Sequence, residues 1–297
     1  MTMFIDMHGH AYRKPCPFPN RFATMDEMLA IYDRDGIRRA VLQPLVGPET
    51  YLPQSNDDIL EMVELHPDRF IPFCNVDPRA LTNSCDAPFG DLLRYYRDRG
   101  VKGVGEFMPN LPFLDPLVQN FFKHVQDVGF PLCFDSRTMI GGGYGLYDEA
   151  GMPQLEKSLL RFPKLVFIGH GPPFWAEMGR LDTPGDRAGY PAYPIREEGV
   201  MPKLMRRHPN LWADLSAGSG FNALNRDLDH AVTFLNEFQD RLMFGTDICS
   251  PDAPTPPLIG LLNTFKAEGK ISAQTYAKIA CGNAIRLLKI DNGNGKR

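Results

Sequence analysis

The sequence predicts a single-domain α/β protein, a (β/α)8 TIM barrel over residues 1–290. Three observations favour this fold. Eight short apolar or β-branched runs alternate with segments of helical periodicity. The length of 297 residues and the hydrophobic content of 43% suit one barrel domain. No linker or internal repeat interrupts the alternation, which predicts parallel strands with right-handed crossovers.

Each apolar run predicts one strand. In chain order the expected strands are Phe4–His8, Arg39–Gln43, Phe70–Asn75, Val101–Phe107, Pro131–Asp135, Leu165–His170, Leu211–Leu215 and Leu242–Asp247. The intervening helices show their periodicity most clearly over Asp57–Leu65 and Leu117–Val128. Gly100, Gly129 and Pro163 mark helix ends directly before strands. An open doubly wound sheet is the alternative fold, but no G-x-G-x-x-G follows the first strand.

Two segments rich in glycine or proline interrupt the regular pattern. Gly141–Gly145 follows the fifth strand and Gly171–Pro194 follows the sixth. Both lie on the side of the strands where barrel enzymes build their sites from loops, although plain surface loops are the alternative. Residues 291–297 are predicted to form a disordered tail.

Composition excludes several classes of partner. The net charge of −4 argues against nucleic acids and anionic membranes. No apolar run reaches the roughly 18 residues of a membrane span, and no secretory signal is visible. The six cysteines form no C-x-x-C pair, and Cys74 and Cys133 fall inside strand-like runs, where Cys is a small buried hydrophobe. A reduced, cytoplasmic protein is expected, and a homo-oligomer is compatible with the sequence.

His8 and His10 are the first candidate site residues. Side chains in a strand alternate between faces, so these two point the same way. Imidazole is the commonest metal ligand, and two on one face can bind one divalent ion. A pair of polar residues at a strand end is the alternative interpretation.

Further polar residues end other strands. These are Glu106, Asp135, His170 and Asp247. The carboxyl ends of barrel strands converge on one mouth, where such groups are costly to bury unless they are paired or bind metal. The set therefore predicts a centre of one or two metal ions, with an ion-paired mouth as the alternative.

Other candidates have weaker support. Arg137 could clamp a substrate carboxylate, or could form a structural ion pair. Asn110, Phe174 and Trp175 follow strands four and six and could line the pocket or pack within loops. The remaining histidines fall in helices or near helix ends and are expected to cap helices or lie at the surface: His66, His124, His208 and His230. Neither a G-x-S-x-G motif nor a nucleophilic cysteine context indicates covalent catalysis.

Four stretches resemble the amidohydrolase superfamily, within it the aminocarboxymuconate-semialdehyde-decarboxylase-like branch, amidohydrolase 2. They are Phe4–His10, Phe167–Gly171, Leu242–Asp247 and Gly282–Leu288. The resemblance implies that His8, His10 and Asp247 bind a divalent metal, with Asp247 also moving protons. It implies that His170 binds metal or positions substrate. Val104–Phe107 is similar to members in which a strand-four Glu is a ligand.

Asp135 departs from the family pattern, which usually has histidine at the end of strand five. The carboxylates of Glu106, Asp135 and Asp247 carry a total charge of −3. One divalent ion would leave the cluster negative and two would leave it slightly positive, so the number of ions stays open. Two ions would suit an anionic small-molecule substrate. Zinc is the expected metal, and the carboxylate ligands also admit manganese.

Three functions are compatible with this sequence. The first is a metal-dependent hydrolase in which Asp247 takes a proton from water, which attacks a carbonyl carbon, while the metal or His170 stabilises the oxyanion. The second is a non-oxidative carboxy-lyase acting on a small carboxylic acid, which a carboxylate-binding Arg137 would favour. The third is a catalytically silent barrel that binds metal or ligand.

Overall fold

The computed structural model describes residues 3–15, 22–50 and 54–291, and it confirms the (β/α)8 fold. Eight parallel strands follow one another in chain order: β1 (Phe4–Gly9), β2 (Ile37–Leu42), β3 (Phe70–Pro72), β4 (Val104–Phe107), β5 (Leu132–Phe134), β8 (Phe167–Gly169), β9 (Leu211–Asp214) and β10 (Leu242–Met243). They form a three-stranded sheet, β1-β2-β3, and a five-stranded sheet, β10-β9-β8-β5-β4.

Backbone hydrogen bonds cross both seams between these two sheets. At one seam, the N–H of Cys74 donates to the carbonyl of Gly103 and the N–H of Gly105 donates to that of Cys74, each over 3.0 Å. At the other, the N–H of Met7 donates to Phe244 over 3.0 Å and the N–H of Asp247 donates to His8 over 2.7 Å. The carboxyl ends of β1 and β10 are therefore tied together, which brings their polar residues to one place.

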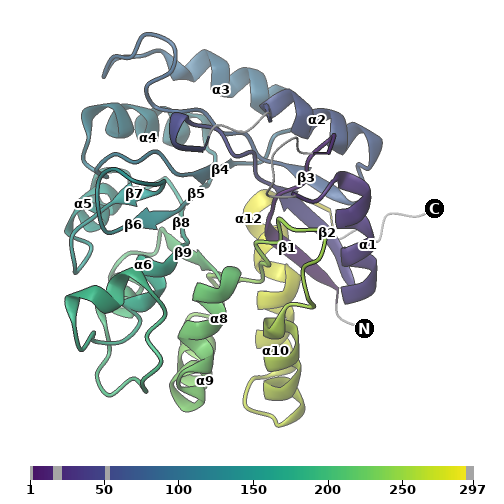
Figure 1. The fold of residues 1–297 in the computed structure, drawn as a ribbon, viewed down its shortest axis with the longest axis vertical. Coiled ribbons are helices and arrows are strands. Elements are labelled where there is room, and N and C mark those ends of the chain that lie inside the picture. Colours follow the sequence, from purple (N-terminus) through teal and green to yellow (C-terminus); the bar gives the residue numbers. More distant parts are fainter. Residues whose placement is uncertain (1–2, 16–21, 51–53, 292–297) are drawn as a thin grey trace.

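Helices surround the strands (Figure 1). They are α1 (Met25–Asp35), α2 (Asn56–Leu65), α3 (Phe89–Asp98), α4 (Pro116–Val128), α5 (Pro153–Arg161), α6 (Pro172–Ala176), α7 (Val200–Arg207), α8 (Ala217–Asn225), α9 (Leu228–Glu237), α10 (Pro257–Ala267), α11 (Ala273–Ala277) and α12 (Asn283–Leu288). Short helical turns occupy Pro48–Thr50, Pro184–Ala188 and Lys278–Gly282, and β6 (Ser136–Arg137) pairs with β7 (Leu146–Tyr147) beyond β5. No helix in the described part of the chain could cross a membrane.

The core has two layers. A large cluster fills the space between the strands and the helices, including Leu42, Phe107 and Phe134. A second cluster fills the barrel interior, where Trp212 and Met243 pack with α12 residues Ala284 and Leu288. Because these apolar side chains fill the inside, the polar residues gather at the carboxyl ends of the strands.

Two of the β-bulges in the sheets lie at residues of the predicted site. On β1, Met7 and His8 together lie opposite Val41, because Asp6 pairs with Ala40 and Gly9 pairs with Leu42. Met7 belongs to the interior cluster, and His8 follows it on the same face. The extra residue thus lets Met7 pack in the apolar interior of the barrel. His8 and His10 then face the same interior closer to the carboxyl ends of the strands.

The second bulge is on β4. Val104 pairs with Leu132 and Phe107 with Phe134, so that Gly105 and Glu106 together lie opposite Cys133. A Cβ at Gly105 would lie 2.0 Å from Oε1 of Gln43 and 2.9 Å from Cβ of Cys133. Glycine is therefore required where the chain turns the Glu106 side chain inward.

The predicted strands are all present, but most are shorter than the apolar runs. The run Leu242–Asp247 contains only two strand residues, since Phe244–Asp247 leaves the β9 edge and bonds to β1 and Lys278–Gly282 instead. Cys74 and Cys133 are buried, as predicted. Cys16 and residues 292–297 of the predicted tail lie outside the described residues.

Candidate metal centre

Three histidines present their Nε2 atoms to one point at the carboxyl ends of the strands. The Nδ1 atom of His8 donates to Asp214 over 2.8 Å, and that of His170 donates to the same carboxylate over 3.0 Å. The Nδ1 atom of His10 donates to the backbone carbonyl of Gln43 over 2.8 Å. These bonds place the proton of each neutral ring on Nδ1, which leaves the Nε2 lone pairs free for a metal ion.

Two carboxylates complete this arrangement. Oε2 of Glu106 lies 3.5 Å from Nε2 of both His8 and His10. Oδ1 of Asp247 lies 3.3 Å from Nε2 of His10 and 3.8 Å from that of His8. His170 approaches the same two carboxylates, at 3.7 and 3.9 Å.

These separations suit a bound cation. Ligands about 2.0–2.1 Å from a tetrahedral zinc ion lie about 3.4 Å from one another. Nε2 of His8 is buried and has no hydrogen-bond partner among the described residues. Because Nδ1 of His10 donates to Gln43, its Nε2 can approach the Asp247 carboxylate only with a positive charge, which either a proton on the ring or a metal ion between the two atoms would supply. The donor set of imidazole and carboxylate therefore fits a divalent transition metal.

A second group of ligands lies beside the first. Glu106, Asp135 and His170 can place one atom each within 4.8 Å of one another, and Glu106 belongs to the first group as well. Burial, reinforced by the charge of Glu106, raises the pKa of Asp135 to about 8. Asp135 therefore sits where a second cation would favour its ionised form.

The charges of the cluster shift the pKa values of its members strongly. Burial opposes a charge on His8 and His170, but the carboxylates of Asp214 and Glu106 outweigh it. The pKa of His8 is raised well above its usual value, and that of His170 is raised to about 9. Burial also opposes ionisation of Asp247, yet the hydrogen bond from His10 and the charged histidines lower its pKa to about 2.

Asp214 belongs to the candidate centre but was missed by the sequence analysis. It is fully buried at the end of β9, and its two oxygens orient His8 and His170. Burial alone would raise its pKa, but both histidines hold the pKa well below its usual range. Its position in the sequence could have identified it, because Asp214 follows Trp212 by two residues and therefore shares the interior face of a buried strand.

Asp6 was missed as well. It is fully buried and accepts hydrogen bonds from the N–H groups of His8 and Thr246 and from the hydroxyls of Thr246 and Tyr32. It thereby fixes the first strand to the segment that carries Asp247. Asp247 itself has a left-handed backbone, with φ of 58°, which Asp tolerates better than most residues.

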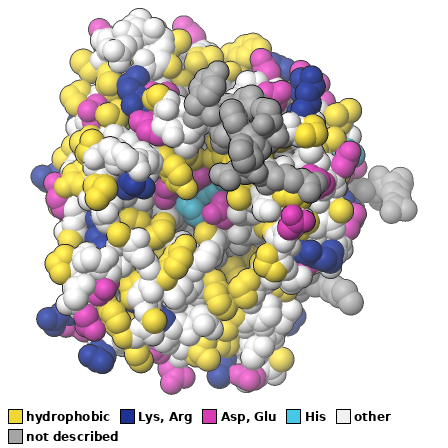
Figure 2. All heavy atoms as spheres, in the orientation of Figure 1, with side chains coloured by type: hydrophobic (Ala, Val, Ile, Leu, Met, Phe, Trp, Pro, Cys, Tyr) yellow, Lys and Arg dark blue, Asp and Glu magenta, His cyan; other side chains and the backbone are white. Residues whose placement is uncertain are grey.

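A cavity of about 300 Å³ opens above the cluster. His10, Glu106, Asp135, His170 and Asp247 form its polar floor, and a histidine with acidic neighbours is visible in the central hollow of Figure 2. Tyr144 and Tyr190 line it from the two irregular loops predicted from the sequence. Among the described residues, no Lys or Arg lines this cavity.

The three predicted substrate-binding residues lie outside that lining. The guanidinium of Arg137 donates to the carbonyl of Gly142 over 2.9 Å. Asn110 accepts from the N–H of Gly141 and donates to the carbonyl of Gly145, so it fastens the loop that carries Tyr144. Trp175 is buried, with its ring centre 5.4 Å from that of Phe174.

The four histidines predicted to be peripheral lie on the helices. His66 and His208 end α2 and α7, and His208 also pairs with Glu156 at 3.2 Å. His124 lies within α4 and His230 within α9. The structure therefore brings together His8, His10 and His170 from different strands and leaves the other four apart.

Comparison with known structures supports the fold. 5-Carboxyvanillate decarboxylase from Sphingomonas paucimobilis is 17% identical with a TM-score of 0.63, over 98% of this chain and 100% of that one. A probable 2-pyrone-4,6-dicarboxylic acid hydrolase from Acinetobacter baumannii is 17% identical with a TM-score of 0.58, over 98% and 100%. A dihydroxybenzoic acid decarboxylase from a Polaromonas species, with bound manganese, is 16% identical with a TM-score of 0.59, over 100% of both chains.

No curated protein sequence matches the chain. A family model described as amidohydrolase matches residues 5–290, a range that contains every residue of the cluster. The structural neighbours include both decarboxylases and a hydrolase, so they agree with this family without selecting a reaction. This protein belongs to the amidohydrolase 2 family.

Proposed function

We propose that this protein is a metal-dependent hydrolase that attacks the carbonyl carbon of a small amide, lactone or ester. One observation carries the proposal: the Nε2 atoms of three buried histidines and two carboxylates converge on the floor of a cavity of about 300 Å³. Nε2 of His8 is buried without a hydrogen-bond partner among the described residues and lies 3.5 Å from Oε2 of Glu106, a separation expected of two ligands of one cation.

His8, His10, Glu106 and Asp247 would hold the first ion. Glu106, Asp135 and His170 offer a second position, with Glu106 shared. Zinc is the expected metal, and manganese suits the carboxylates equally well, as in the relative from Polaromonas. A divalent ion here would polarise the carbonyl group and lower the pKa of water to about 7.

Asp247 would act as the general base. Its side chain is 30% exposed, whereas that of Glu106 is 7% exposed, so Asp247 can reach both the ligand cluster and the cavity. As an ionised carboxylate it would accept a proton from the attacking water and then pass it to the leaving group. His170 faces the same space and would complete the second ion's ligands or donate to the carbonyl oxygen.

The charge of the cavity lining bears on the anionic substrate expected from the sequence, a class on which the decarboxylases among the structural neighbours also act. No cationic side chain among the described residues lines the cavity, and Arg137 is bonded to the loop carbonyl of Gly142. Within the described part of the chain, a substrate carboxylate would therefore have only bound metal to offset it.

A carboxy-lyase is the second candidate, because the structural neighbours include decarboxylases of hydroxylated benzoates. The two reactions differ in product. A hydrolase consumes water and yields an acid with an alcohol or amine, whereas a carboxy-lyase releases carbon dioxide.

The test has two stages. The purified protein is stripped with a chelator, reloaded with zinc or manganese, and analysed for metal content. The loaded protein is then supplied with lactones, amides, esters and hydroxybenzoates, and acid and carbon dioxide release are measured. We expect at least one equivalent of metal and acid release only from the loaded protein. Less than a tenth of an equivalent would overturn metal dependence, and carbon dioxide release alone would establish the carboxy-lyase.

A further inference from the structure

We propose that the substrate carries an uncharged apolar arm, which occupies a second cavity adjoining the candidate metal centre. This inference rests on the proposed function, because it places the reacting group of the same molecule beside Asp247. The second cavity has a volume of about 470 Å³ and lies between α8, the segment after β10 and the start of α10.

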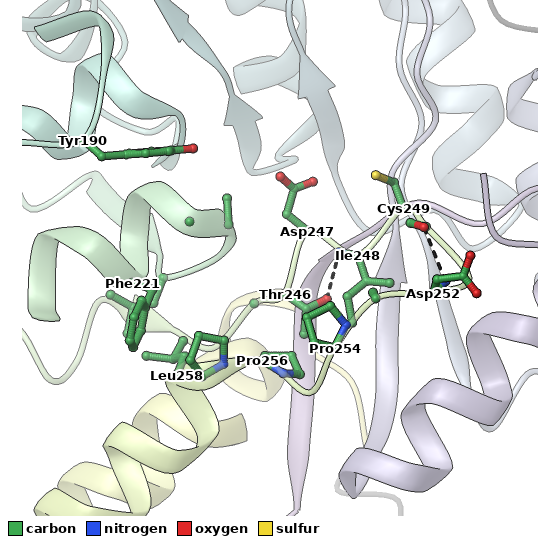
Figure 3. A pocket seen from close by; sticks show the side chains of 17 residues that line it. Tyr190, Phe221, Thr246, Asp247, Ile248, Cys249, Asp252, Pro254, Pro256 and Leu258 are labelled. Carbon is green, nitrogen blue, oxygen red and sulfur yellow. Dashed lines mark hydrogen bonds between the residues drawn. The ribbon is translucent and has the colours of Figure 1, made fainter. Parts of the chain in front are cut away.

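The walls of this cavity are largely apolar. Phe221 comes from α8, Leu258 from the first turn of α10, and Pro254 and Pro256 from the segment between β10 and α10. Figure 3 shows these four side chains along one side of the cavity, with the ring of Tyr190 and the carboxylate of Asp247 on the other. Such a surface next to a reactive carboxylate favours a ligand group that gains by leaving water.

The two cavities share residues. Asp247, Tyr190, Ala217 and Cys249 line both, so one small molecule can reach from the ligand cluster into the apolar cavity. The carboxylate of Asp247, seen at the edge of the second cavity in Figure 3, belongs to one of these shared residues. A substrate with its carbonyl group near His170 would therefore direct one substituent toward Phe221.

The charge of the lining excludes an anionic arm. Apart from Asp247, the ionisable carboxylate in the lining is Asp252, and no Lys or Arg of the described chain contributes to it. A carboxylate or phosphate on the arm would face Asp252 and Asp247 without a compensating cation. An alkyl or aryl arm meets no such cost.

Hydroxamic acids of graded length test this assignment. Their head group binds metal, and the probes are acetohydroxamate, butanohydroxamate, hexanohydroxamate and the monohydroxamate of adipic acid. Dissociation constants are measured by calorimetry on zinc-loaded protein. We expect each added methylene to tighten binding up to about fourfold, which corresponds to about 0.8 kcal/mol per buried CH2. The adipic probe should bind at least tenfold more weakly than hexanohydroxamate.

Phe221→Ala should reduce the preference for hexanohydroxamate over acetohydroxamate, because it removes a wall of the apolar cavity. Pro254→Asp should reduce it as well, since it adds a third carboxylate. The matched control is Leu160→Ala, which removes an apolar side chain that is 66% exposed on α5 and lines neither cavity. The ratio of the two dissociation constants in each protein cancels any general loss of folded protein or metal.

The outcomes separate the two proposals. If acetohydroxamate binds but chain length and Phe221→Ala leave the ratio unchanged, the apolar arm is wrong and the metal centre stands. If the adipic probe binds as tightly as hexanohydroxamate, the arm is not required to be uncharged, and the inference is overturned. If no hydroxamate binds and the protein retains no zinc, the proposed function itself fails.

Discussion

The Asp214 carboxylate lies 2.8 Å from Nδ1 of His8 and accepts its hydrogen bond. The other oxygen of the same group accepts from His170, 3.0 Å away. One buried carboxylate from β9 therefore orients rings from β1 and from the end of β8. This arrangement makes Asp214 a positioning residue for two predicted ligands at once.

We expect Asp214→Asn to weaken metal binding by about 10- to 100-fold. The amide can accept from one histidine only, and its NH2 group would face the Nδ1 proton of the other. Competition with a chromophoric chelator measures the dissociation constant. Asp127→Asn, an exposed carboxylate on α4, is the matched control and should leave it unchanged. An unaltered constant for Asp214→Asn would show that the histidines hold their orientation without it.

Asp247→Asn is predicted to lower turnover by about 10²- to 10⁴-fold, the range for loss of a general base. Asparagine retains an oxygen ligand and tolerates the left-handed backbone at this position. Metal content should therefore fall much less than turnover. Steady-state rates and elemental analysis on the same preparation check both. Near wild-type turnover would assign proton transfer to another group, with Asp135 the first to examine.

Metal binding at pH 7 should release protons. The pKa of His170 is raised to about 9 and that of His8 is raised well above its usual value, so both rings carry an extra proton at pH 7 in the metal-free protein. A metal ion competes with these protons, and its affinity should therefore rise as the pH increases from 7 to about 9. Calorimetry in two buffers of different ionisation enthalpy counts the protons. Binding without proton release would contradict the charge distribution described above.

Gly105→Ala should destabilise the protein by about 1–3 kcal/mol, the cost of overpacking a core. The added Cβ would lie 2.0 Å from Oε1 of Gln43, whose backbone carbonyl holds His10. Metal affinity should fall with stability because displacement of Gln43 moves His10. Gly260→Ala on α10 is the control, since its Cβ would meet no atom within 4 Å. Urea unfolding compares the variants, and equal stabilities would remove the claimed constraint at Gly105.

The sequence allowed the barrel and the ligand cluster to be predicted from one rule: polar residues at the carboxyl ends of apolar runs. The same rule could not find Asp214, because its run continues to the buried Leu215 and does not end on the carboxylate. The rule also could not find Asp6, because this residue lies in the middle of the first apolar run, Phe4–His8. For both residues, most partners come from segments distant in the sequence, so only the folded arrangement reveals their roles.

Arg137 shows a second limit. Its spacing of two residues from Asp135 suggested a common face, which holds only while a strand continues. Here β5 ends at Phe134, and Ser136–Arg137 pairs with Leu146–Tyr147 in a separate ribbon. The guanidinium consequently bonds to Gly142. Loop pairings of this kind depend on backbone contacts that periodicity does not encode.

The bulges on β1 and β4 also define what a transplanted copy of this centre would need. In a regular strand, the residue after Met7 or Gly105 would turn toward the helices, and His8 and Glu106 would leave the cluster. A designer who grafts these ligands onto an idealised eight-stranded scaffold must therefore insert one residue in each of two strands. Deleting Met7 from the present chain should remove the bulge on β1, so that His8 alone lies opposite Val41 and keeps facing the interior, while the barrel loses one apolar side chain below the cluster.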